Sequence, residues 1–322
     1  MSGASPKNPK AVKNRMFEDA TTIKEAYTQG AAMLEAAGVA DAVRDSRTLL
    51  ALAMDVSENR LILGQQSPVS PDRLRVYEGM VQRRASGEPL QHITGNTEFM
   101  GLPFVVRPGV LIPRQETEIM VEKALEIIKS DSWPEGRVRI LDLCCGSGVI
   151  GISIARLAQA SDGSAADIEV TCADISTDCV YLAHTNAELN GVDRNMRFVR
   201  GDMAAPFAGR ADDPADASVV FGMVCCNPPY IPTEVIGTLQ REVRDHDPTL
   251  ALDGGYDGLD FYRRIACEVP EVMTPGGTLI LEIGSEQREA VTEILTESGN
   301  FDKAECIKDL AGLDRVIMAV RK

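Results

Sequence analysis

The 322-residue sequence lacks any apolar run that approaches the roughly 18 residues of a membrane-spanning helix. Its first 15 residues, MSGASPKNPKAVKNR, also lack the apolar core of a secretory signal and contain no acidic residue. We expect residues 1–20 to be a disordered leader, with a transit peptide as the alternative. The predicted location is therefore the cytoplasm, with a mitochondrial or other organellar matrix left open.

Positive charge is also scarce. The sequence has 33 Lys and Arg against 48 Asp and Glu, which gives a formal net charge of −15. It contains no dense run of basic residues of the kind that contacts phosphates. Because a field of this sign repels a polyanion, the sequence predicts no direct nucleic-acid partner.

Cysteine is present eight times, but the CxxC spacing of zinc ribbons and redox motifs is missing. Two adjacent pairs stand out, Cys144-Cys145 and Cys225-Cys226. The spacing indicates neither a zinc site nor a small disulfide framework. We expect small, buried, reduced thiols and no metal.

What is present is the composition of a globular protein, with 44% apolar and 25% charged residues. Apolar residues recur at helical spacing over residues 21–88, which predicts a bundle of about four helices. Ser70 and Pro71 fit the N-cap and first position of the last of these helices. Short β-prone runs between glycines and prolines predict a β-hairpin linker over residues 89–115. The rest, residues 116–322, is the second predicted domain.

After Val138, short apolar runs alternate with amphipathic helical runs, beginning with VRILDLCCGSG and VIGISIARLAQA. Such alternation predicts an α/β fold with a parallel, doubly wound sheet, which binds ligands outside the carboxyl ends of its strands. The final runs, KAECIKDL and RVIMAVRK, predict a closing antiparallel pair.

Three of the predicted strand ends carry residues suited to a nucleoside. In ILDLCCGSGVIG, Gly146 and Gly148 allow close approach to the backbone at a helix N-terminus. Asp174 follows Gly146 by 28 residues and can accept hydrogen bonds from ribose hydroxyls. Asp202 could reach an adenine amino group, and Met203 could pack on the ring. A tight turn, a helix cap and a core methionine are the alternatives, but together these residues favour an adenosine-bearing cofactor.

The run CCNPPYIP follows the fourth strand. Pro228 and Pro229 stiffen the backbone and bring no N–H group, so nearby carbonyls stay free to accept hydrogen bonds. A planar NH₂ group could donate to the Asn227 side-chain oxygen and to the Pro228 carbonyl, which would aim its nitrogen lone pair at an electrophile. Tyr230 could stack on that group. A plain β-turn is the alternative.

With these motifs the sequence resembles class I S-adenosylmethionine methyltransferases that act on exocyclic or amide nitrogen. Within them it resembles the release factor glutamine N5-methyltransferases, the HemK family. The resemblance extends from about Glu25 to Val320 and includes PLQHITGNTEFMGLPF, IPRQETE, CNPPYI and DGGYDGLDFYRRI in family order. NPPY also occurs in nucleobase methyltransferases, whereas IPRQETE together with DGGYDGLDFYRRI is more specific.

The resemblance implies a seven-stranded, Rossmann-like methyltransferase sheet with a small N-terminal helical-bundle domain that docks a class 1 peptide chain release factor. It implies methyl transfer from S-adenosylmethionine to the side-chain amide nitrogen of the glutamine in the Gly-Gly-Gln motif. The product is S-adenosylhomocysteine, and the enzyme is expected to be a monomer.

The resemblance also implies which residues form the site. The catalytic residues would be Asn227, Pro228 and Tyr230. The cofactor would be bound by Cys144, Cys145, Gly146, Ser147, Gly148, Asp174, Asp202, Met203 and Asn227. The substrate would be bound by Phe99, Arg114, Glu116, Thr117, Asn227, Pro228, Pro229 and Tyr230.

Three positions depart from the family pattern. Cys144 stands where the family usually has glycine, so its φ is either negative or strained, and cofactor affinity is the property at stake. Cys145 replaces the usual threonine. Gln115 replaces the usual proline, which would loosen that loop.

The resemblance leaves three alternatives for the function. Ribosomal-protein glutamine methyltransferases share NPPY but differ in the IPR segment. A nucleobase amino group would suit the same turn, although the acidic surface disfavours it. A catalytically silent protein that binds a translation factor is the third alternative, because of Cys144 and Cys145.

Overall fold

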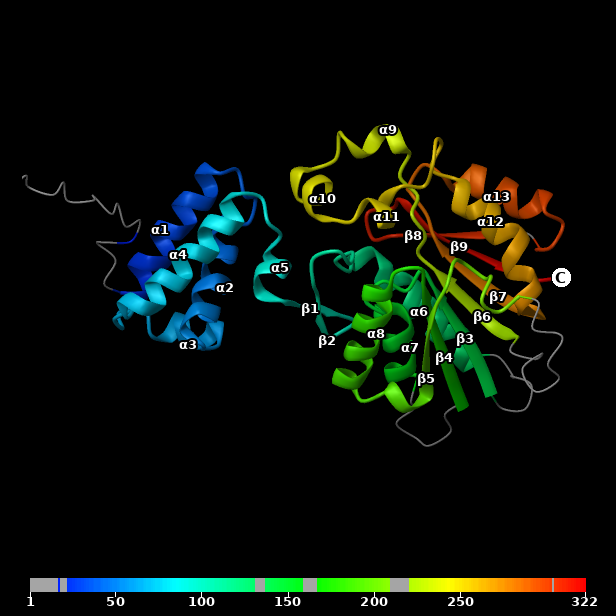
Figure 1. Cartoon of the computed structure of the whole chain (residues 1–322), viewed down its shortest axis with the longest axis horizontal. Helices are drawn as coiled ribbons and strands as arrows, with labels where there is room; N and C mark the ends of the chain where they lie inside the picture. Colours follow the sequence, from blue (N-terminus) through cyan, green and yellow to red (C-terminus); the bar gives the residue numbers. More distant parts are fainter. Residues whose placement is uncertain (1–16, 18–21, 131–136, 159–166, 209–219, 303) are drawn as a thin grey trace, which may run out of the picture. The chain divides into compact units, whose positions relative to one another are not determined.

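The computed structural model describes residue 17 and residues 22–130, 137–158, 167–208, 220–302 and 304–322 (Figure 1). The predicted leader, residues 1–20, lies outside these ranges except for Phe17. The chain divides into two compact units, Met1–Thr94 and Gly95–Lys322. In the described ranges, no helix has both the length and the apolar character needed to cross a membrane.

The first unit is a bundle of α1 (Ile23–Ala36), α2 (Ala42–Met54), α3 (Glu58–Leu63), α4 (Pro71–Ala85) and the short α5 (Leu90–Thr94). As predicted, the Ser70 side chain caps α4 by accepting from the Arg73 N–H, and Pro71 opens the helix. The short α5 falls within the predicted hairpin linker, residues 89–115, and its Ile93 is buried in the apolar core of the bundle.

The second unit begins with a hairpin. Strands β1 (Asn96–Phe99) and β2 (Leu102–Val105) pair antiparallel, which confirms the predicted hairpin. The chain then passes through a 3₁₀ turn, η1 (Gln115–Thr117), directly into α6 (Glu118–Ser130).

A seven-stranded sheet follows, with the order β5-β4-β3-β6-β7-β9-β8. The strands from β5 to β7 are parallel, and β9 is antiparallel to both of its neighbours. Both the seven strands and the closing antiparallel pair confirm the predictions. The bounds are β3 (Arg137–Leu143), β4 (Asp167–Asp174), β5 (Met196–Arg200), β6 (Phe221–Cys226), β7 (Met273–Glu282), β8 (Glu305–Lys308) and β9 (Asp314–Val320).

Helices cover both faces of the sheet, as a doubly wound fold requires (Figure 1). One face packs against α6, α7 (Val149–Leu157) and α8 (Thr177–Asn190), and the other against α12 (Asp260–Glu268) and α13 (Arg288–Glu297). Successive residues of β3 point to opposite faces of the sheet. Ile140 packs in the core on the side of α6, α7 and α8, and Leu141 in the core on the side of α12 and α13. Strands buried on both faces explain the near-continuous apolar runs of the sequence.

Three short helices fill the connection from β6 to α12: α9 (Thr233–Ile236), α10 (Arg241–His246) and α11 (Thr249–Leu252). The sequence analysis predicted none of them. Two further 3₁₀ turns are η3 (Asp193–Asn195) and η5 (Val269–Val272). The strand order reverses between β3 and β6, and a ligand site is expected outside the carboxyl ends of these strands.

Candidate active site

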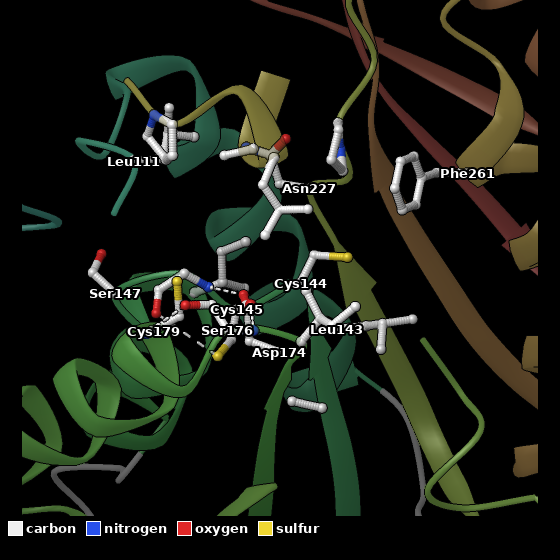
Figure 2. Close-up of a pocket in the computed structure, with 18 of the residues that line it drawn as sticks. Leu111, Leu143, Cys144, Cys145, Ser147, Asp174, Ser176, Cys179, Asn227 and Phe261 are labelled. Carbon is white, nitrogen blue, oxygen red and sulfur yellow. Dashed lines mark hydrogen bonds between the residues drawn. The ribbon is translucent and has the colours of Figure 1, made fainter. Parts of the chain in front are cut away.

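A cavity of about 280 Å³ lies in the second unit at this switch point (Figure 2). Its walls come from the segments that follow four strands, β3, β4, β5 and β6. The loop before α6 and residues of α11 and α12 complete it. Of the site residues predicted on these four segments, Gly148, Pro228 and Tyr230 do not line the cavity, whereas the following do: Cys144, Cys145, Gly146, Ser147, Asp174, Asp202, Met203, Asn227 and Pro229.

The glycine-rich turn after β3 is held by its backbone. The Cys145 N–H donates to the Ala173 carbonyl at 3.0 Å, and the Gly148 N–H closes the turn on the Cys145 carbonyl at 2.8 Å. A Cβ at Gly148 would stand 2.9 Å from the Ala183 Cβ of α8, so glycine allows α7 and α8 to pack closely. A Cβ at Gly146 would meet no atom within 4 Å. Gly146 therefore leaves space on the side that a ligand needs.

Asp174, at the end of β4, ties this turn to the next strand. Its Oδ2 accepts from the Gly146 N–H and its Oδ1 from the Ser176 N–H, each at 2.9 Å. The alternative role, capping α8, belongs to Ser176, whose hydroxyl accepts from the Cys179 N–H. Each carboxylate oxygen has two lone pairs, so Asp174 can also accept from two hydroxyl groups in the cavity.

The segment after β5 brings Asp202 and Met203 to the cavity. The Asp202 carboxylate accepts from Arg264 Nη1 at 2.8 Å, so one of its oxygens is already engaged. Arg264 and Phe261, one turn apart on α12, line the cavity as well, and the sequence analysis missed both. Their i, i+3 spacing in DFYRR was the available signal, because it places both side chains on one face of a helix.

Cys144 and Met203 both have left-handed backbones, with φ of 58° and 48°. Their sulfur atoms are 3.7 Å apart. Of the two possibilities left open for Cys144, strain is therefore the one that occurs. Strain of this kind gathers at functional sites, where the surrounding structure enforces it.

The strain predicts a difference between two variants of Cys144. Both Cys144→Gly and Cys144→Ala remove the sulfur, but only glycine relieves the left-handed backbone. We expect the glycine variant to be more stable than the alanine variant by about 1 kcal/mol in urea-induced unfolding. An alanine variant as stable as the glycine variant would contradict the strained φ.

Asn227 and Pro229 of the Asn-Pro-Pro-Tyr turn line the cavity, while Pro228 is buried and does not line it. The turn is anchored, because Gln287 Nε2 donates to the Tyr230 carbonyl at 2.9 Å. No donor in the described part of the chain reaches the Pro228 carbonyl. The Pro228 carbonyl is thus an acceptor without a donor among the described residues.

The Tyr230 side chain lies differently from what was expected. Its hydroxyl donates to Glu282 Oε1 at 3.4 Å, and burial raises the pKa of Tyr230 to about 12. The ring packs against the core formed by α12 and α13 and does not line the cavity.

Glu282, the last residue of β7, is a buried carboxyl that the sequence analysis missed. It is 2% exposed and accepts from the Thr117 hydroxyl at 2.6 Å as well as from Tyr230. Burial raises the pKa of Glu282. The signal for it was a single acidic residue at the end of the apolar run GTLILEIG.

Only some of the predicted substrate-binding residues line the cavity. Thr117 and Arg114 line the cavity, and the Arg114 guanidinium donates to the buried Asp247 at 2.5 Å. Glu116 is exposed on η1 and does not line the cavity. Phe99 is 2% exposed and packs edge-on against Phe104 in the core, so it is not brought to the cavity either.

The residues that face the cavity fit an adenosine-bearing sulfonium cofactor. Asp174 offers acceptors, Gly146 leaves space beside the backbone, and Phe261 and Met203 supply apolar and aromatic surface. The sheet order, the glycine-rich turn after β3 and Asn-Pro-Pro-Tyr after β6 together define a class I methyltransferase that uses S-adenosylmethionine.

Comparison with known proteins narrows this class. A family model described as "PrmC N-terminal domain" matches residues 25–95, and one described as "Methyltransferase domain" matches residues 134–312. The release factor glutamine methyltransferase of Clostridium acetobutylicum is 36% identical over 299 residues, covering 93% of this chain and 98% of that protein. Those of Agrobacterium fabrum and Geobacter sulfurreducens are also 36% identical, covering 88% and 92% of this chain and 92% and 95% of those proteins. The chain belongs to the release factor glutamine methyltransferase family.

Proposed function

We propose that this protein transfers the methyl group of S-adenosylmethionine to the side-chain amide nitrogen of the glutamine in the Gly-Gly-Gln motif of a class 1 peptide chain release factor. The observation that carries the proposal is that Asn227 and the glycine-rich turn line one cavity, and that the Pro228 carbonyl beside Asn227 in the chain accepts from no donor in the described residues. The Asn227 side-chain oxygen and that carbonyl can take the two hydrogens of a planar NH₂ group.

Orientation is what the reaction needs most. An amide nitrogen is a poor nucleophile because its lone pair is delocalised. Two acceptors that bind both N–H groups orient the nitrogen toward the methyl group and stabilise the positive charge that develops on it. When bound, S-adenosylmethionine supplies an electrophilic methyl group. The Asn227 side-chain oxygen and the Pro228 carbonyl would hold the amide NH₂ with its nitrogen toward that methyl group and would accept hydrogen bonds from it as the nitrogen becomes positive.

The roles of the individual residues follow from their places. We assign the cofactor to the turn Cys144–Gly148 together with Asp174, Asp202, Met203 and Asn227, all of which line the cavity except Gly148. Pro229 and Thr117 also line it and would border the substrate glutamine. Tyr230 and Gln287 support the turn from behind, since one reaches Glu282 and the other holds the turn's backbone.

The charge of the chain supports a protein substrate. A formal net charge of −15 opposes the close approach of RNA, while it leaves binding to a protein open. In this proposal the helical residues 21–88 bind the release factor, residues 89–115 link them to the catalytic domain, and the enzyme acts as a monomer in the cytoplasm.

Tritium transfer from labelled S-adenosylmethionine tests the substrate. Purified release factor, its variant with alanine in place of the motif glutamine, and ribosomal RNA are compared under one condition. We expect label in the first sample alone. Label in RNA would favour the nucleobase alternative, and equal label in the alanine variant would rule out the motif glutamine.

A further inference from the structure

A short chain of hydrogen bonds runs from the buried end of β7 to the catalytic turn. The Thr117 hydroxyl is 2.6 Å from Glu282 Oε2, and Asn227 Nδ2 is 3.4 Å from the Thr117 hydroxyl. Thr117 is 3% exposed and Glu282 2%. Hydrogen bonds thus connect Thr117 with Asn227, 110 residues later in the sequence, and with Glu282, 165 residues later.

The chemistry of Glu282, Thr117 and Asn227 determines which group donates and which accepts in each of these hydrogen bonds. An ionised carboxylate only accepts hydrogen bonds, so the Thr117 hydroxyl gives its single hydrogen to Glu282. The Thr117 oxygen is then left with lone pairs alone toward Asn227. Of the two ends of the Asn227 amide, only Nδ2 can bond to it, and Oδ1 is turned the other way.

The two ends of an asparagine amide have nearly the same shape, so packing alone selects poorly between them. A flipped Asn227 would present its own NH₂ to the NH₂ of the substrate. Two donors would then face each other, and one of the two hydrogen bonds that orient the substrate would be lost.

We infer that Thr117 and Glu282 are positioning residues which lock the Asn227 amide with its oxygen toward the substrate nitrogen. This inference rests on the proposed function and adds two residues to it. Tyr230 completes the arrangement, because its hydroxyl donates to the second oxygen of Glu282 and fixes the carboxylate. Glu282 does not line the cavity, so it can act on the substrate only through Thr117 and Asn227.

The test uses the near-isosteric Thr117→Val, which removes the hydroxyl, and Thr117→Ser, which keeps it. Single-turnover methyl transfer to release factor and cofactor affinity are measured for each. We expect the valine variant to be about tenfold slower, the loss of roughly one hydrogen bond. Cofactor affinity should stay unchanged, and the serine variant should keep the wild-type rate.

Two controls separate positioning from a structural role. In an Asn227→Ala background, Thr117→Val should cost nothing further, because no amide remains to be oriented. Thr233→Val removes another threonine that donates to a carboxylate, Asp253 at 2.7 Å, and should keep the wild-type rate.

Three results would overturn the inference: full activity of Thr117→Val, an equal loss in Thr117→Ser, or the same loss with and without Asn227. Failure of the proposed function gives a different result, since the wild-type enzyme itself would then transfer no methyl group to release factor. Thermal unfolding of each variant shows whether the fold is kept.

Discussion

Asn227→Ala should lower methyl transfer to release factor by about a hundredfold or more, a far larger effect than its effect on cofactor affinity. In the proposed arrangement the side-chain oxygen of Asn227 accepts a hydrogen bond that strengthens as the substrate nitrogen becomes positive, and losing one such preorganised group typically costs two to three powers of ten. The measurement is single-turnover transfer of tritium at saturating cofactor, with calorimetry for the affinity.

Asn195→Ala is the matched control, because this asparagine is exposed on η3 and does not line the cavity. It should keep the wild-type rate. An Asn227→Ala variant that retains most of its activity would rule out the two-acceptor arrangement at the turn.

Asp174→Ala should weaken cofactor binding by about a hundredfold, the loss of two hydrogen bonds to a charged acceptor. The carboxylate holds the Gly146 N–H and the Ser176 N–H and faces the cavity, so its removal takes away both acceptors for the cofactor and the anchor of the turn. Calorimetric titration with S-adenosylhomocysteine measures the effect without catalysis.

Asp178→Ala serves as the control here, since this exposed acid on the first turn of α8 lies outside the cavity lining. Its affinity should match the wild type. Unchanged binding by the Asp174 variant would mean that the cofactor occupies another place in the cavity. Thermal unfolding of both variants checks that the sheet remains intact.

Features carried by local patterns could be predicted from the sequence. The spacing of 28 residues between Gly146 and Asp174 predicted two neighbouring strand ends, and a hydrogen bond of 2.9 Å now joins them. Ser70 and Pro71 predicted the start of α4 because capping depends on a few adjacent residues. The alternation of strands and helices predicted the doubly wound sheet for the same reason.

Features that depend on distant partners could not be predicted in this way. The positioning role proposed for Glu282 depends on its hydrogen bond with Thr117, which lies 165 residues earlier in the sequence. Arg264 reaches Asp202 from α12, 62 residues further along the chain. Phe99 was expected to bind the substrate because of its motif. It is buried instead, in the core and against Phe104.

The backbone conformation of Cys144 could be predicted only in part. A cysteine in place of glycine could either change the turn or adopt the same turn with strain, and the local sequence did not decide between them. The turn is fixed by bonds from Cys145 to β4 and from Gly146 to Asp174, so the cysteine adopts φ of 58°. Tertiary contacts outweigh a local preference of about 1–2 kcal/mol here.

Mass spectrometry of release factor after incubation with the enzyme and S-adenosylmethionine tests the central claim most directly. The account predicts that the peptide containing Gly-Gly-Gln gains the mass of one CH₂ group and that fragmentation places it on the glutamine side chain. An unmodified peptide, or a methyl group on any other residue, would contradict the account.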